Sequence, residues 1–382
     1  SLRMPPPLAA LPPVTVRPLS IAETPSGTSK TDPNAPPRTD SSSAPGPSTW
    51  TRLSTTNVPP DSTIVPPERP ASKRITSKPP DAAASDPAAL GWMVGSPPSP
   101  ERTVYFHDGS YFRFPAWRWS VSNFRQLMPT VNVSRGLGAP VPLRSKPRAD
   151  IDSVEFTPIG SSETMTWSDS LTANYTDGIV VLHRGRIVYE RYFGVLKEDG
   201  QHGAMSVTKS FVGTLGAMLV AARALDADRP VADYGPELAE SAFGDATVRQ
   251  VLDMTTAIRF SEDYEDPDAE IWAHASAGNP LPKPDDYQGP RSYYEFLQTV
   301  QKKGRHGDAF AYKTANTDAL GWVIARVTGR SVATLLSERI WRHLGAEQDA
   351  YFSVDSLGTP FAGGGLNTGP VSYTHLTLPT TK

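Results

Sequence analysis

The chain has 382 residues and a formal net charge of −3, a near balance that gives no reason to expect a nucleic-acid partner or binding to an acidic membrane surface. It contains no cysteine, which excludes a disulfide framework and thiolate metal sites and leaves the compartment open, with the cytoplasm favoured. No apolar run is long enough to predict a membrane-spanning helix.

The start of the chain differs in composition from the part that follows. Residues 1–100 contain 23 of the 39 prolines, interleaved with serine, threonine, alanine and aspartate. Such a segment cannot bury enough apolar surface to offset the entropy lost on ordering. We therefore predict a disordered segment over residues 1–86, a folded domain over residues 87–369 and a non-native tail over residues 370–382. A rigid proline-rich spacer or an SH3-type ligand is the alternative for the first segment.

Aromatic residues between Trp92 and Trp119 predict a lead-in segment that packs onto the domain. Residues 179–183 and 187–193 then form two β-rich runs on either side of Arg184-Gly185-Arg186. This spacing predicts a β-hairpin. Its strands are largely apolar, as expected when helices cover one face.

Five helices are predicted after the hairpin. Beyond Met205, apolar residues recur at i, i+4, i+7, i+8 and i+11, which is one helix face. Ser292 and Glu295 fit a capping box at a helix start, and glycines end the last two helices. The predicted positions are after Met205, from Thr247, from Ser292, from about Asn316 to Gly329, and from near Ser331 to Gly345.

The S-x-x-K motif Ser206-Val207-Thr208-Lys209 occurs once in the chain, where an amphipathic helix begins. Positions i and i+3 share a helix face, so the hydroxyl and the amine can meet. Serine is a weak nucleophile until a base takes its proton. A lysine amine can be that base only when neutral, and burial and the positive end of a helix both favour the neutral form. An N-cap serine followed by a solvated lysine would show the same spacing. A lysine in a first helical turn is electrostatically unfavourable, however, and this favours a functional interpretation.

A second block, from Tyr312 to Asn316, precedes another predicted helix and reads YKTAN. A tyrosine beside a cationic amine loses its proton more readily and can relay one to a leaving group. Thr314 and Asn316 offer hydrogen bonds to a substrate amide. The alternative is ordinary helix-entry chemistry, with Asn316 as the cap.

Four segments together carry a resemblance to a known family. They are residues 205–210, 247–254, 263–267 and 312–316, which read MSVTKS, TVRQVLDM, DYEDP and YKTAN. With these motifs the chain, over about residues 88–369, resembles the serine β-lactamase-like (penicillin-recognising) superfamily. Within that superfamily it is similar to the nylon-oligomer (6-aminohexanoate-dimer) hydrolases, which are related to class C β-lactamases and to carboxylesterases.

The resemblance implies a role for each matching residue. Ser206 would be the acylated nucleophile, Lys209 the base and Tyr312 the proton donor to the leaving amine. Tyr264 matches a loop position that lines the acyl pocket in such enzymes, and Thr314 and Asn316 remain the predicted substrate contacts.

The chain also departs from the family pattern. The turn after the 247–254 segment reads Thr255-Thr256-Ala257 where the family has a Thr-Ser-Gly-like turn. The family's third motif, Lys/His-x-Gly on a strand that also supplies an oxyanion-hole amide, is absent. Residues 361–368 still resemble the family, but residues 371–382 resemble a translated sequencing adapter. We therefore expect a truncated domain, inactive in this form, that lacks the C-terminal strands the hairpin would join.

Other site types find no support in the sequence. The seven histidines are scattered with no H-x-x-x-H, so no metal site is predicted. There is no G-x-S-x-G, which argues against an α/β-hydrolase. The run Gly363-Gly364-Gly365 is not followed by Lys-Ser/Thr, so it does not predict a phosphate loop. No cofactor is expected.

These observations lead to one main prediction and its alternatives. The fold class is α+β, β-lactamase/transpeptidase-like, with helices on both faces of a central antiparallel sheet, a second, mostly helical region and the site between them. The function is hydrolysis of a linear amide through an acyl-enzyme on Ser206. The partner is a small-molecule amide or ester, with no nucleic acid and no membrane. The alternatives are a carboxylesterase, a D-amino-acid peptidase or β-lactamase, and a catalytically dead ligand-binding homologue or inactive fragment.

Overall fold

The computed structural model describes residues 81–283 and 285–377. The disorder predicted for residues 1–80 therefore lies outside the described residues, as do residues 378–382 of the predicted tail. Residues 81–86 correct the predicted boundary, because they are folded onto the domain. Asp86 caps helix α1 (Pro87–Leu90), where its Oδ1 accepts from the amides of Ala88 and Ala89 at 2.9 Å.

The predicted aromatic lead-in packs onto the domain. It contains α2 (Ala116–Ser120) and α3 (Phe124–Leu127), preceded by short 3₁₀ turns at Pro100–Arg102 and Ser110–Phe112. Together with strand β8 these elements form their own apolar cluster, whose buried members include Tyr111, Trp119, Phe124 and Tyr351. Many of the aromatic side chains of this segment are thus buried in the cluster that packs it onto the domain.

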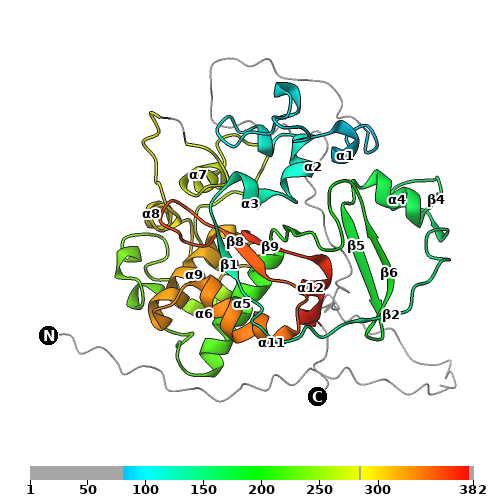
Figure 1. The fold of residues 1–382 in the computed structure, drawn as a ribbon. Helices are drawn as coiled ribbons and strands as arrows, with labels where there is room; N and C mark the ends of the chain where they lie inside the picture. Colours follow the sequence, from blue (N-terminus) through cyan, green and yellow to red (C-terminus); the bar gives the residue numbers. More distant parts are fainter. Residues whose placement is uncertain (1–80, 284, 378–382) are drawn as a thin grey trace, which may run out of the picture. The chain divides into compact units, whose positions relative to one another are not determined.

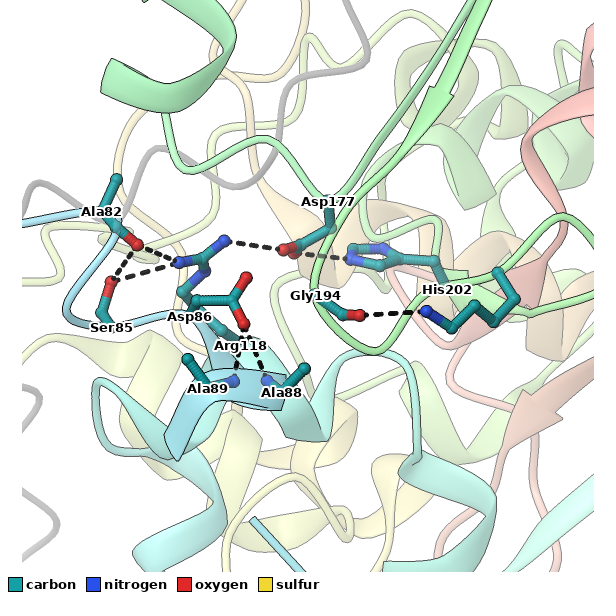
Figure 2. Close-up of polar contacts among 10 residues, drawn as sticks. Ala82, Ser85, Asp86, Ala88, Ala89, Arg118, Asp177, Gly194 and His202 are labelled. Atoms are coloured by element: carbon teal, nitrogen blue, oxygen red, sulfur yellow. Dashed lines mark hydrogen bonds and ion pairs between the residues drawn. The ribbon is translucent and has the colours of Figure 1, made fainter. Parts of the chain in front are cut away.

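A buried charged network joins the lead-in to the strands. Arg118, only 6% exposed, donates to the Ala82 carbonyl at 2.8 Å and to Asp177 Oδ1 at 3.3 Å (Figure 2). The other oxygen of Asp177 lies 3.3 Å from His202 Nε2. Because buried charges need partners, this network fixes residues 81–86 against the loop that precedes β5.

The central sheet has four strands in the order β1-β8-β9-β7 and is antiparallel (Figure 1). It brings together segments that are far apart in the chain, and β7 ends three residues before Ser206. The strands are β1 (Thr130–Val133), β7 (His202–Gly203), β8 (Ala350–Ser353) and β9 (Leu366–Thr368).

The predicted hairpin is present as β5 (Gly178–His183) and β6 (Arg186–Tyr192). Arg184 and Gly185 have φ of 51° and 71°, and positive φ at both central residues is the turn that matches the twist of the flanking strands. The expectation that the hairpin would join further C-terminal strands stays a prediction, and among the described residues the hairpin does not pair with the central sheet. It pairs instead with β2 (Arg144–Ser145), in parallel, as a separate sheet.

All five predicted helices are confirmed. The side chains of Thr247 and Ser292 cap α6 and α8 by accepting from the amides of Gln250 and Glu295. The Glu295 carboxylate accepts from the Arg291 amide instead of the Ser292 amide, so only half of the predicted capping box is formed. The helices are α5 (Val207–Ala221), α6 (Val248–Leu252), α8 (Tyr293–Thr299), α9 (Thr314–Thr328), and α10 (Val332–Leu336) with its continuation through a π turn at Ser337–Trp341 into α11 (Arg342–Leu344).

The remaining elements are small. They are α4 (Trp167–Ala173), α7 (Glu270–Ala277), α12 (Pro370–Thr374), the two-stranded sheet of β3 (Glu155–Phe156) and β4 (Met165–Thr166), and 3₁₀ turns at Val231–Asp233, Pro236–Leu238 and His375–Thr377. No helix among the described residues is long and apolar enough to cross a membrane.

The main core lies where α5, α6 and α9 meet. A Cβ added at Gly216 of α5 would come 3.1 Å from Leu252 and 3.2 Å from Leu320, so a glycine there allows close packing of the three helices. The first residues of the predicted tail also pack. Pro370 and Val371 are buried in α12, and a Cβ on Gly178 of β5 would lie 3.6 Å from Pro370. The non-native origin of the tail stays a prediction.

Candidate active site

Ser206 lies at the junction of the central sheet and the main core. Strand β7 ends at Gly203, the Ala204 amide donates to the Leu366 carbonyl of β9 at 2.8 Å, and Ser206 is the residue before α5. Met205, directly before it, has φ of 44°. A non-glycine residue in this left-handed region is uncommon, and such strain persists only where the surrounding structure holds it. The result is an exposed hydroxyl at the N-terminus of a buried helix.

Lys209 lies one turn into the same helix and is buried, with 9% of its surface exposed. Its Nζ is 3.1 Å from Ser206 Oγ and donates to the Gly363 carbonyl at 2.6 Å. The i, i+3 spacing therefore brings hydroxyl and amine into hydrogen-bond contact, as the helical geometry predicts. Proton transfer between the two groups needs this separation.

Tyr312 approaches the same amine from a loop. Lys209 Nζ lies 4.9 Å from the centre of the Tyr312 ring, a cation–π distance. Tyr312 is 46% exposed, so one side of its ring covers the amine and the other faces solvent. Across residues 81–283 and 285–377, no hydrogen bond joins its hydroxyl to Ser206 or Lys209. The three predicted catalytic residues thus meet at Lys209.

Tyr264 lies in a loop beside this group. It is 48% exposed and packs edge-on against Trp272 at 5.9 Å. Burial of part of the side chain, followed by the negative charge of Glu262 and by Tyr312, raises the pKa of Tyr264 above its usual range. The Tyr264 hydroxyl is held in its protonated form and is hydrogen-bonded to the Glu262 side chain.

Thr314 and Asn316, the predicted substrate contacts, are both buried in the first turn of α9. Asn316 is 0% exposed, and its Oδ1 accepts from Thr256 Oγ1 at 2.6 Å. Its Nδ2 has no partner within the described chain. The Thr314 amide donates to Glu262. Both side chains are buried and closed off from solvent, and their contact with a substrate stays a prediction.

The lysine next to Tyr312 in sequence points elsewhere. Lys313 Nζ donates to the carbonyls of Thr256 at 3.2 Å and Ile258 at 2.6 Å. Burial, and then the charge of Lys303, lower the pKa of Lys313. The amine beside the Tyr312 ring is therefore that of Lys209, and Lys313 holds the loop at residues 256–258.

Residues 361–366 form a glycine-rich turn that closes the inner side of the site. The Gly363 amide donates to Asp318 Oδ1 at 2.9 Å, while its carbonyl accepts from Lys209. The Leu366 amide donates to Thr208 Oγ1 at 3.1 Å. Because Thr208 belongs to α5 and Asp318 to α9, the turn is bonded to both helices.

Gly363, Asp318 and Glu262 were not predicted as site residues. The glycines of the turn entered the sequence analysis only within residues 361–368, which resemble the family, and as an argument against a phosphate loop. Asp318 has a sequence signature that could have been used, because it is the one acidic residue in an otherwise uncharged stretch from Thr314 to Ile324. No group of three or more histidine, aspartate or glutamate side chains in the described part of the chain could hold a metal ion.

Comparison with known proteins identifies the family. The family model for Beta-lactamase matches residues 171–371, which is more than half of the chain. The chain belongs to the Beta-lactamase family. Its α+β, β-lactamase/transpeptidase-like fold, predicted from the four motifs, is thereby confirmed.

Within the Beta-lactamase family, two relatives share the same description. The 6-aminohexanoate-dimer hydrolase of Paenarthrobacter ureafaciens is 34% identical over 289 residues, covering 75% of this chain and 66% of that protein. A solved structure assigned as a candidate 6-aminohexanoate-dimer hydrolase of Bacillus anthracis has a TM-score of 0.65 and 30% identity, covering 70% of this chain and 69% of that one. The chain thus spans slightly less than two thirds of the curated relative's length.

Proposed function

We propose that this protein is a serine hydrolase that cleaves linear amides through an acyl-enzyme on Ser206. The observation that carries the proposal is the 3.1 Å contact between Lys209 Nζ and Ser206 Oγ at the N-terminus of α5. A buried amine in contact with an exposed serine hydroxyl is the arrangement that a nucleophile and its base require. The similarity to 6-aminohexanoate-dimer hydrolases supports the linear amide as substrate.

Acylation begins with attack of Ser206 Oγ on the amide carbonyl carbon, while the hydroxyl proton moves to the neutral amine of Lys209. The N-terminus of α5 favours the negative charge that develops on the substrate oxygen. The Ser206 amide, which has no acceptor among the described residues, supplies one donor to that oxygen. The remaining oxyanion donor, expected on the family's third motif, stays a prediction.

Release of the amine requires a proton as the carbon–nitrogen bond breaks. Tyr312 donates this proton, and the ammonium of Lys209 beneath its ring restores it. Water then attacks the ester on Ser206, giving the free acid and the serine hydroxyl. Tyr264 is protonated and lies close to Tyr312. It donates a hydrogen bond that orients the acyl part of the substrate.

The test is covalent labelling followed by substrate comparison. A fluorophosphonate should leave one adduct on the peptide that contains Ser206, and Ser206→Ala should remove it. The assay uses both this chain and a version extended with the C-terminal strands of the 6-aminohexanoate-dimer hydrolase, because the unextended chain is expected to be inactive. The extended version is expected to hydrolyse the 6-aminohexanoate dimer faster than it hydrolyses penicillins.

Three outcomes contradict parts of the proposal. Labelling at another residue, with Ser206→Ala still reactive, overturns the nucleophile. Efficient turnover of p-nitrophenyl esters or of penicillins, with no cleavage of amide oligomers, overturns the linear amide as substrate. The esterase or the β-lactamase alternative then takes its place. Full activity of the unextended chain overturns the expectation that it is inactive in this form.

A further inference from the structure

Lys209 makes its shortest polar contact with a backbone carbonyl, that of Gly363, rather than with Ser206. Gly363 is in turn held by a buried aspartate and histidine. We propose that Asp318 and His274 are positioning residues that hold Gly363 in place and thereby aim the amine of Lys209 at Ser206. This inference rests on the proposed function, in which Lys209 is the base.

The first link is Gly363, which contributes both of its backbone groups. The carbonyl accepts from Lys209 Nζ at 2.6 Å and the amide donates to Asp318 Oδ1 at 2.9 Å. Glycine is required there, since an added Cβ would lie 2.4 Å from the Thr314 side chain. A shift of this one residue therefore moves the acceptor of the lysine amine.

The second link is Asp318, which is 4% exposed and lies one helical turn after Thr314 in α9. A buried carboxylate is stable only when donors satisfy it. Its two oxygens use different donors, the Gly363 amide on one and His274 Nε2, 2.8 Å away, on the other. An ionised carboxylate only accepts hydrogen bonds, so Nε2 carries the proton.

The third link is His274 of α7, which is 1% exposed. Aromatic rings surround its imidazole, including Tyr293 at 5.1 Å, Phe296 at 5.2 Å and Phe361 at 5.4 Å between ring centres. Phe361 belongs to the same turn as Gly363. His274 therefore contacts the turn directly and also fixes the carboxylate that holds it.

The consequence concerns the orientation of the amine. A lysine side chain has several rotatable bonds, and its head group can occupy many positions unless contacts restrict it. The hydrogen bond to the fixed Gly363 carbonyl restricts the position of Lys209 Nζ. In that position Nζ lies 3.1 Å from Ser206 Oγ. Misplacement of a catalytic group by about 1 Å can cost about 100-fold in rate.

The experiment measures the rate of fluorophosphonate labelling of Ser206 in the full chain, well below the melting temperature of every variant. Asp318→Ala removes the acceptor of the Gly363 amide. Asp318→Asn keeps an oxygen acceptor for the Gly363 amide, and its amide nitrogen can donate to His274 Nε2 once the imidazole carries its proton on Nδ1 instead. It therefore serves as the conservative rescue. The matched control is Asp355→Ala, since Asp355 is also buried, at 2% exposure, and also accepts from backbone amides, those of Tyr293, Leu357 and Thr359.

We expect Asp318→Ala to label about 100-fold more slowly than the parent. Asp318→Asn should recover most of that loss, and Asp355→Ala should label at close to the parent rate even where its melting temperature falls as far. In a Lys209→Ala background, Asp318→Ala should add little, because its effect passes through the amine. A crystal structure of Asp318→Ala should show the Gly363 carbonyl displaced from Lys209.

The outcomes separate the two proposals. If Ser206 labels neither in this chain nor in the extended version, the proposed function fails. If Ser206 labels but Asp318→Ala and Asp355→Ala slow labelling equally, Asp318 and His274 have only a structural role. The inference is then wrong. The inference is also wrong if Asp318→Ala has its full effect without Lys209, or if the crystal structure retains the contact between Lys209 and Gly363.

Discussion

The amine of Lys209 lies between two regions that are built differently. On one side, the start of α5 provides Ser206 and Lys209 from positions three residues apart. On the other side, the turn at residues 361–366 provides a carbonyl 154 positions further along the chain. The helix side depends on local geometry, whereas the turn side depends on contacts with two other helices.

The difference is also one of chemistry. In the proposed mechanism the α5 side carries the groups that change protonation or form bonds, while the turn side contributes only backbone groups. Loss of a reacting group removes a step, while displacement of a backbone acceptor only misaligns one. Substitutions on the α5 side should therefore have larger effects than substitutions in the turn.

The largest effect is expected for Ser206→Ala, which removes the nucleophile. Loss of a nucleophilic serine costs about 10⁶-fold in kcat in a well-studied hydrolase. The control is Ser210→Ala on the same helix, since Ser210 is exposed and makes no contact with Lys209. Residual turnover by Ser206→Ala at more than a hundredth of the parent rate would remove Ser206 from the mechanism.

Lys209→Ala should come next, with kcat lower by about 10²–10⁴-fold, the range for loss of a general base. The KM should change little, because the amine acts on the serine proton and not on substrate binding. Steady-state kinetics on the extended protein measure both constants. A rise in KM at constant kcat would instead assign Lys209 to substrate binding.

Tyr312→Phe distinguishes the role of the Tyr312 hydroxyl as a proton donor from the role of its ring, which packs over the Lys209 amine. The phenyl ring keeps the contact with Lys209 but loses the hydroxyl, so amide cleavage should fall by about 100-fold. Fluorophosphonate labelling should change much less, because its fluoride leaving group needs no proton from a phenol. An equal loss in both assays would mean that Tyr312 acts on the Ser206 attack itself.

The smallest effects should come from glycine substitutions, and these compare the two regions directly. Gly363→Ala would place a methyl group 2.4 Å from Thr314 and should destabilise the fold by about 1–3 kcal/mol while slowing Ser206 labelling. Gly213→Ala in α5 meets no atom within 4 Å and should stabilise the helix by about 0.5–1 kcal/mol without changing labelling. Thermal unfolding of both variants tests this. Equal stability of the two would contradict the close packing of the turn.

The sequence by itself determined the elements whose pattern is local. The apolar spacing after Met205 predicted α5, Thr247 and Ser292 marked the starts of α6 and α8, and the residues around Arg184 predicted the hairpin. The S-x-x-K spacing was enough to predict the contact between Ser206 and Lys209, because residues three positions apart on a helix share a face.

Only the tertiary structure decided which distant segments meet. The hairpin pairs with β2 instead of the central sheet, Asp318 reaches Gly363 from α9, and His274 reaches Asp318 from α7. Side-chain periodicity reports which face of an element is buried, not what covers it. A buried histidine and aspartate contribute no periodicity at all. Their role depends on the two hydrogen bonds that Asp318 accepts, and only the packed domain brings those partners together.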